Sequence, residues 1–153
     1  MSQDGIRFER NHASVSAIHD HLKRCDLAFT PPLSSRVNIQ DYAKKIKDHA
    51  ENFEVWNKHE LIGLIAVYRD HEKRRAFITN VSVESAYRGK GFARILLEDC
   101  ITYLVKQNFI TVSLQVSALN TIAIHLYESF GFVVSGTEGD DLEMSLNLNE
   151  NKT

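Results

Sequence analysis

Apolar residues in the first quarter of the chain recur at two different periods. Ile6–Arg10 alternates apolar and polar positions, which predicts a short first strand. The next apolar positions follow at spacings of three and four residues, as on one face of a helix: Val15, Ile18, Leu22 and Cys25. We expect Asn11 to cap this helix, because its side chain can accept hydrogen bonds from the unpaired amides of a first turn.

Proline and asparagine divide the next part of the chain. Pro31 and Pro32 cannot continue a helix, so a loop is predicted from there to about Val37. Asn38 is predicted to cap a second helix that runs to about residue 50. Three β-like segments follow, at 53–55, 61–68 and 76–83, and the short turns between them indicate an antiparallel meander.

The second half alternates helices and strands. Gly89 and Gly91 break the extended pattern, and a strong helical stripe follows over residues 92–104. A strand is predicted at 110–116, a helix from Asn120 to Gly131, and a closing hairpin at 132–134 and 142–148. The order is β-α-α-β-β-β-α-β-α-β-β. It predicts one mixed α/β domain over residues 1–153, with a frayed polar tail at 149–153.

Composition excludes several classes of protein. The chain has 153 residues, 43% of them hydrophobic and 25% charged, with a net charge of −2, so neither nucleic acid nor a membrane surface is an expected partner. No apolar run reaches the ~18 residues that cross a bilayer, and no secretory signal is visible at the start. Cys25 and Cys100 fall at apolar helical positions, which favours buried thiols in a reducing compartment and predicts a cytoplasmic protein. His19 and His21 point to different helical faces and no zinc spacing occurs, so no metal is predicted.

Residues 88–93, Arg-Gly-Lys-Gly-Phe-Ala, stand between a strand and a helix. Unpaired amides at a helix start attract anions, glycines allow close approach, and Arg88 and Lys90 add positive charge. A diphosphate site is predicted. The spacing is not that of a Walker loop, and Arg94 occupies the third small position of a dinucleotide fingerprint. A plain turn capped by a basic residue is the alternative.

A second pattern spans residues 120–132. Asn120 and Tyr127 are two helical turns apart and share a face, and the small Ala123 between them lets an extended ligand lie against the helix. The alternative is an amphipathic core helix with Tyr127 packed inside.

Together the two patterns resemble the GCN5-related N-acetyltransferase superfamily. Arg88, Gly91 and Ala93 match its Arg/Gln-x-x-Gly-x-Gly/Ala signature, and residues 120–132 are similar to its Asn-x-x-Ala-x-x-x-Tyr-x-x-x-Gly-Phe element. The resemblance covers about Ile78 to Leu148, and the first ~70 residues match only in element order. It implies an enzyme that transfers an acetyl group from acetyl-coenzyme A to a primary amine by direct attack, on a sheet splayed between its fourth and fifth strands.

The resemblance also implies site residues. The pantetheine arm is expected in the gap between the two splayed strands, with a backbone amide near Val81–Val83 facing the thioester oxygen. Tyr127 is the expected general acid, since a phenol is protonated at neutral pH. The expected cofactor-binding residues are Val81, Ser82, Val83, Arg88, Gly89, Lys90, Gly91, Phe92, Ala93, Asn120, Ala123 and Tyr127.

The general base stays open at this point. The strand before the phosphate loop has no carboxylate, and Glu84 is expected to face the loop. Water relayed by Thr79, Asn80 or Ser82 is favoured, and His125 is an alternative that points away from Tyr127.

The acceptor is expected between residues 29–37 and the hairpin turn at 136–141. Candidate contacts, each of which could also be an ordinary surface or packing residue, are Phe29, Arg36, Tyr42, Tyr68 and Asn80. Acidic residues in the turn, Glu138, Asp140 and Asp141, could attract a cationic amine, and a solvated turn explains them equally well. A small-molecule amine such as an amino sugar is the preferred acceptor, with a monomer or homodimer as the expected state. A protein or peptide N-acetyltransferase and a non-catalytic acyl-coenzyme A sensor are the alternatives.

Overall fold

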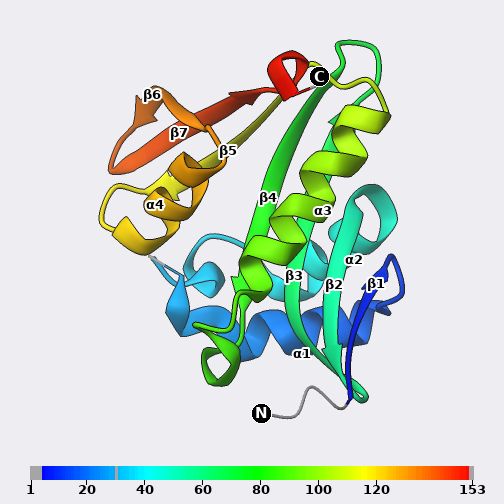
Figure 1. Cartoon of the computed structure of the whole chain (residues 1–153). Helices are drawn as coiled ribbons and strands as arrows, with labels where there is room; N and C mark the ends of the chain where they lie inside the picture. Colours follow the sequence, from blue (N-terminus) through cyan, green and yellow to red (C-terminus); the bar gives the residue numbers. More distant parts are fainter. Residues whose placement is uncertain (1–4, 30, 152–153) are drawn as a thin grey trace.

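A computed structural model of the chain describes residues 5–29 and 31–151. Seven strands form one sheet, in the order β1-β2-β3-β4-β5-β7-β6. The strands are β1 (Ile6–Arg10), β2 (Glu51–Asn57), β3 (Glu60–Asp70), β4 (Arg75–Val83), β5 (Thr111–Ser117), β6 (Val133–Glu138) and β7 (Asp141–Asn147). The helices are α1 (Val15–Cys25), α2 (Ile39–His49), α3 (Phe92–Lys106) and α4 (Thr121–Ser129) (Figure 1). The order of helices and strands is the predicted one.

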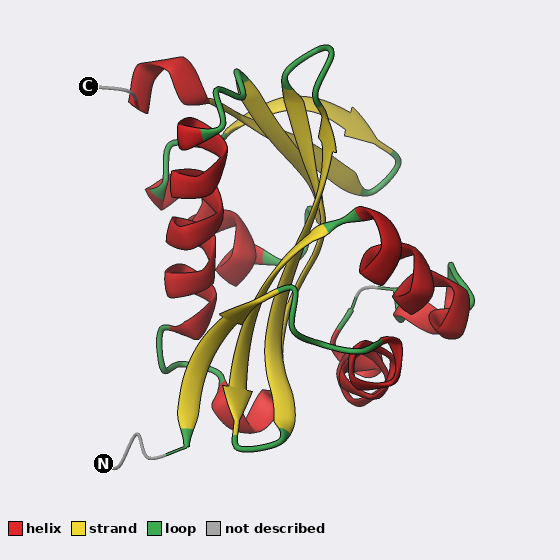
Figure 2. Cartoon of the chain, turned by 90° about the vertical axis from the view of Figure 1, so that its right-hand side faces the viewer, coloured by secondary structure: helices red, strands yellow, loops and turns green. Residues whose placement is uncertain are grey.

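Helices cover both faces of the sheet, as Figure 2 shows. On one face of the sheet α3 packs on β3. On the other face of the sheet lie α1 and α2. Strand β3 explains the continuous apolar run in the sequence, because Ile65 and Val67 face α3 while Leu64 and Ala66 face α1 and α2. None of the helices in the described ranges is long and apolar enough to cross a membrane.

The central strands separate where the sequence predicts. Residues Arg75–Ile78 of β4 pair in parallel with Thr111–Leu114 of β5. Beyond Ile78 and Leu114 the two strands continue but no longer pair with each other. A bulge lies at this point, because Ala66 of β3 is opposite Asn80 and Val67 is opposite Ile78, which leaves Thr79 as an extra residue in β4. The predicted splay is therefore confirmed.

The bulge also changes which face of the sheet the β4 side chains reach. Before it, Ile78 packs in the core under α3. After it, Val81 and Val83 pack on that side, while the buried polar side chains of Asn80 and Ser82 turn toward α1. One extra residue thus places polar groups between the sheet and α1.

Two local predictions differ from the structure. Ser14, not Asn11, caps α1, with its hydroxyl accepting a hydrogen bond from the Ala17 amide at 3.1 Å. Asn11 instead takes a positive φ of 56°, and its side chain accepts from the Asn52 amide of β2. The predicted cap at Asn38 is confirmed. Residues Leu148–Asn151 form a 3₁₀ turn that overlaps the tail predicted to fray at 149–153, and residues 152 and 153 lie outside the described part.

Candidate active site

The start of α3 differs from the other helix starts. Side chains cap α1, α2 and α4, whereas Gly91 at the cap of α3 offers none among the residues the structure describes. Gly89 and Gly91 have φ of 77° and 84°, a left-handed conformation that glycine adopts readily. A Cβ built at either position would meet no atom within 4 Å. The start of α3 therefore lies beside two glycines with open space around them, which suits an anion at the first amides of the helix.

A cavity of about 580 Å³ extends from this helix start toward α4 and the free end of β4. Eleven of the twelve predicted cofactor residues line it: Val81, Ser82, Val83, Arg88, Gly89, Gly91, Phe92, Ala93, Asn120, Ala123 and Tyr127. Lys90 does not. The lining also includes residues the sequence did not single out, namely Cys25, Ala28, Tyr87, Ile122 and Leu126. We call this cavity the cofactor cavity.

The edge of β4 in this cavity has backbone groups directed into the gap. The amide of Glu84 donates to the carbonyl of Ile62 on β3 at 2.9 Å. Because backbone groups alternate in direction along a strand, those of Val81 and Val83 point away from β3, toward β5. The carbonyl of Val83 accordingly accepts from Nε of Arg88, at 3.1 Å. Val81 and Val83 can thus pair with an extended ligand.

A second cavity of about 250 Å³ lies beyond β4, under the loop that precedes α2. We call it the acceptor chamber. Four of the five predicted acceptor contacts line it: Phe29, Arg36, Tyr42 and Asn80. Tyr68 lines neither cavity, because its ring packs in the core beside α2 and lies under Nζ of Lys45 at 5.3 Å. Gln115 and Ser117 of β5 and Asp141 of β7 complete the polar wall.

Four residues line both cavities: Phe29, Val81, Asn120 and Tyr127. Tyr127 is buried, and its hydroxyl has no hydrogen-bond partner among the described residues. Burial raises the pKa of Tyr127 above that of a free phenol. The hydroxyl therefore stays protonated at neutral pH, at the place where the two cavities meet, and can donate a proton there.

Comparison with known proteins identifies this arrangement. Residues 15–132 match the Acetyltransferase (GNAT) family. The chain belongs to this family. It is 30% identical over 134 residues to a spermidine N(1)-acetyltransferase of Vibrio cholerae, over 75% of this chain and 78% of the relative. Among solved structures, it resembles the ribosomal-protein-S18-alanine N-acetyltransferase of Escherichia coli, with a TM-score of 0.75, 23% identity and coverage of 93% and 94% of the two chains.

As a GNAT enzyme, the chain uses acetyl-coenzyme A as its cofactor. An N-acetyltransferase of Thermoplasma acidophilum solved with coenzyme A has the same fold, with a TM-score of 0.70 at 16% identity over 92% and 99% of the two chains. The residues present suit such a ligand, since an uncapped helix start, two open glycines and a free strand edge follow one another along a single cavity. In the described ranges, no group of three or more His, Cys, Asp or Glu could hold a metal ion.

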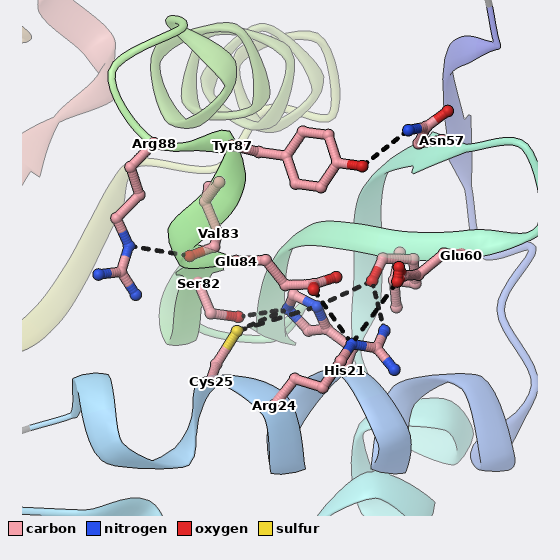
Figure 3. Close-up of polar contacts among 11 residues, drawn as sticks. His21, Arg24, Cys25, Asn57, Glu60, Ser82, Val83, Glu84, Tyr87 and Arg88 are labelled. Atoms are coloured by element: carbon pink, nitrogen blue, oxygen red, sulfur yellow. Dashed lines mark hydrogen bonds and ion pairs between the residues drawn. The ribbon is translucent and has the colours of Figure 1, made fainter.

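The GNAT site holds no carboxylate on β4, as predicted. Glu84 follows the strand, but its side chain does not face the phosphate loop as expected: Oε1 pairs with Nε of Arg24 on α1, at 3.2 Å. The reason is that Glu84 lies where α1 crosses the end of the sheet (Figure 3). His125 is exposed and lines neither cavity.

A buried polar cluster that was not predicted from the sequence lies beneath the site. His21 of α1 approaches Ser82 of β4, with 2.8 Å between Nε2 and Oγ, and Ser82 Oγ lies 2.7 Å from Oδ1 of Asn80. A histidine on the apolar stripe of a predicted helix was the available signal. Its partner, Ser82, lies 61 residues away on β4, and the bulge in β4 decides to which face of the sheet the Ser82 side chain points.

Proposed function

We propose that this GNAT enzyme acetylates the primary amine of a small molecule bound in the acceptor chamber. The observation that carries the proposal is that Tyr127 and Val81 line both cavities. Acyl transfer requires the amine and the thioester to reach one point from opposite sides, and this geometry supports that approach. The chamber volume of about 250 Å³ suits a metabolite or the end of a longer chain.

Each residue at this point has a distinct role in the proposal. When bound, acetyl-coenzyme A supplies the thioester carbon that the amine attacks. The amides of Val81 or Val83, directed into the gap, hydrogen-bond the oxygen on which negative charge develops. Tyr127 gives its hydroxyl proton to the sulfur as the C–S bond breaks and the C–N bond forms. The proton that the amine loses then restores the Tyr127 hydroxyl. Asn120 orients the cofactor arm beside α4.

Two charged residues of opposite sign line the chamber. Arg36 and Asp141 both line it, and neither forms an ion pair or hydrogen bond through its side chain in the described part of the chain. An acceptor with polar substituents besides its amine therefore finds partners at the wall. An amino sugar or a similar metabolite stays the preferred acceptor. The Vibrio cholerae relative, named for spermidine, adds polyamines to the candidates.

A protein N-terminus is the second candidate. The support for it is a sequence relative, the Escherichia coli enzyme named for the alanine of ribosomal protein bS18, which is 44% identical to this chain over 57 residues. A sensor without catalysis is less consistent with the buried, protonated Tyr127 at the junction.

One assay separates these functions. Thiol release from acetyl-coenzyme A is followed with amino sugars, amino acids, spermidine and alanine-initiated peptides as acceptors. We expect saturable release with a small amine. Release with the peptides alone would establish the protein acetyltransferase. Tight cofactor binding by calorimetry without release for any amine would establish the sensor and refute the proposal.

A further inference from the structure

His21 is a buried titratable residue that lines neither cavity. Its side chain is 0% exposed, on the face of α1 that packs against the sheet. Nδ1 lies 3.0 Å from the backbone carbonyl of Leu61, and Nε2 lies 2.8 Å from the hydroxyl of Ser82 (Figure 3). Ser82 in turn contacts the carboxamide of Asn80, which lines the acceptor chamber. A chain of hydrogen bonds thus connects the imidazole to the chamber wall.

The positions of the protons in this series of hydrogen bonds follow from which groups can donate and which can only accept. The carbonyl of Leu61 only accepts, so a neutral imidazole carries its proton on Nδ1 and leaves Nε2 as an acceptor. The hydroxyl of Ser82 must then donate to Nε2, and its oxygen is left to accept from Asn80. The structure has Oδ1 of Asn80 at 2.7 Å from Ser82 Oγ, so this arrangement requires a half-turn of the carboxamide, which brings its NH₂ to Ser82 and its oxygen to the chamber.

A charged imidazole requires the opposite arrangement. With protons on both nitrogens, Nε2 donates to Ser82, whose hydroxyl donates to the carboxamide oxygen of Asn80. The NH₂ then faces the chamber, where the Tyr42 hydroxyl lies within hydrogen-bonding reach of the Asn80 side chain. A half-turn of the carboxamide exchanges its oxygen and nitrogen and interconverts the two arrangements.

The surroundings of His21 favour the neutral form. Arg24 lies on the same helix, where it also donates to the Leu61 carbonyl, and the Cys25 sulfur is 3.8 Å from Nε2. Glu84 from the end of β4 and Glu60 from β3 face this cluster, and both pair with Arg24, not with His21. Burial, with a smaller contribution from Arg24, lowers the pKa of His21 to about 4.

We propose that His21 is a positioning residue whose protonation state decides which end of the Asn80 carboxamide faces the acceptor chamber. With the imidazole neutral, the carboxamide oxygen is presented to the chamber. There it accepts a hydrogen bond from an N–H of the acceptor and so orients the amine nitrogen toward the gap. This role in acceptor binding rests on the proposed function, whereas the link between His21 and Asn80 does not.

Nitrogen-15 NMR of histidine-labelled protein tests the link without any acceptor. At pH 7 we expect protonated Nδ1 and unprotonated Nε2 at His21. Asn80→Asp offers only oxygens to Ser82 and so requires the charged imidazole, and we expect the His21 titration midpoint to rise by about two pH units or more. The double variant Asn80→Asp with Ser82→Ala keeps the new charge but breaks the chain, and its shift should be clearly smaller. An Nε2-bound proton in the wild type, or equal shifts in both variants, would overturn the proposal.

Kinetics test the role in acceptor binding. His21→Leu removes the acceptor for the Ser82 hydroxyl, and we expect KM for the best amine of the panel to rise about 5–10-fold while the Kd for acetyl-coenzyme A stays within about twofold. Ile18→Val, a cavity-forming change on the same buried face, is the matched control and should leave KM unchanged. A KM in His21→Leu equal to that of the control would refute the positioning role. Absence of transfer to every amine would refute the proposed function instead, and the NMR result would still decide the orientation of Asn80.

Discussion

Arg88 and Val83 are joined by a hydrogen bond from the guanidinium Nε to the backbone carbonyl at 3.1 Å. The contact ties the phosphate loop to the end of β4, the strand that lines the cofactor cavity. Because this hydrogen bond fixes the orientation of the guanidinium through Nε, its two terminal nitrogens stay available for a phosphate. Arg88 thus links the two parts of the cofactor site.

This link predicts that lysine cannot replace Arg88. Arg88→Lys keeps the positive charge but loses the two terminal guanidinium nitrogens that can bind a phosphate together. We therefore expect the Kd for coenzyme A to rise about tenfold, a loss of about 1.4 kcal/mol of binding free energy. Calorimetric titration measures it. Pantetheine, which lacks the phosphates, serves as the control ligand. An equal loss of affinity for pantetheine would show that Arg88 supports the strand and not the phosphates.

Gly91 offers a second test of the phosphate site. Gly91→Ala introduces a Cβ at φ 84° into open space at the helix start, so we expect coenzyme A binding to weaken at least tenfold. Backbone strain alone costs about 1–2 kcal/mol of stability. Gly139, at φ 60° in the β6–β7 turn and also without close neighbours, gives a matched control in Gly139→Ala. The two variants should lose similar melting temperature, and only the first should lose affinity; equal affinities would place the phosphates elsewhere.

Tyr127→Phe should separate catalysis from binding. The Tyr127 hydroxyl has no partner in the described residues, so its removal leaves no unpaired group and should change stability and cofactor affinity little. We expect kcat to fall about 100-fold if the phenol donates the proton. Burial raises the pKa of Tyr127, so the wild type should keep its acid form and show no loss of kcat from this group as the pH rises to 10. Unchanged kcat in Tyr127→Phe would remove the phenol from the mechanism.

The chemistry of the cofactor site could be predicted from the sequence because its signals are local. The uncapped glycine start of α3 and the shared face of Asn120 and Tyr127 are fixed by spacings within one turn or one helix. The cap of α1 was mispredicted because Asn11 and Ser14 are both good capping residues. The choice depends on the contact between Asn11 and Asn52, which is set by the pairing of β1 with β2.

The acceptor side could be predicted only in part, because its residues come from distant elements. Asp141 and Gln115 reach the chamber through the pairing of β5 with β7, and the sequence does not specify which edge β7 joins. The His21–Ser82 contact depends on a one-residue bulge at Thr79. Without that bulge, Ser82 would point to the other face of the sheet, away from α1.

The buried imidazole predicts a pH dependence of stability. The pKa of His21 is about 4 in the folded protein against 6.5 for a free imidazole, so the unfolded chain binds more protons between these values. Its contribution to stability is therefore fully present above pH 6.5 and is lost as the pH falls toward 4, by about 3 kcal/mol in all. Urea unfolding from pH 7 to pH 4 measures this slope. His21→Leu should flatten it, whereas replacement of the exposed His125 by asparagine should not. An unchanged slope in His21→Leu would mean that His21 is not held neutral by the fold.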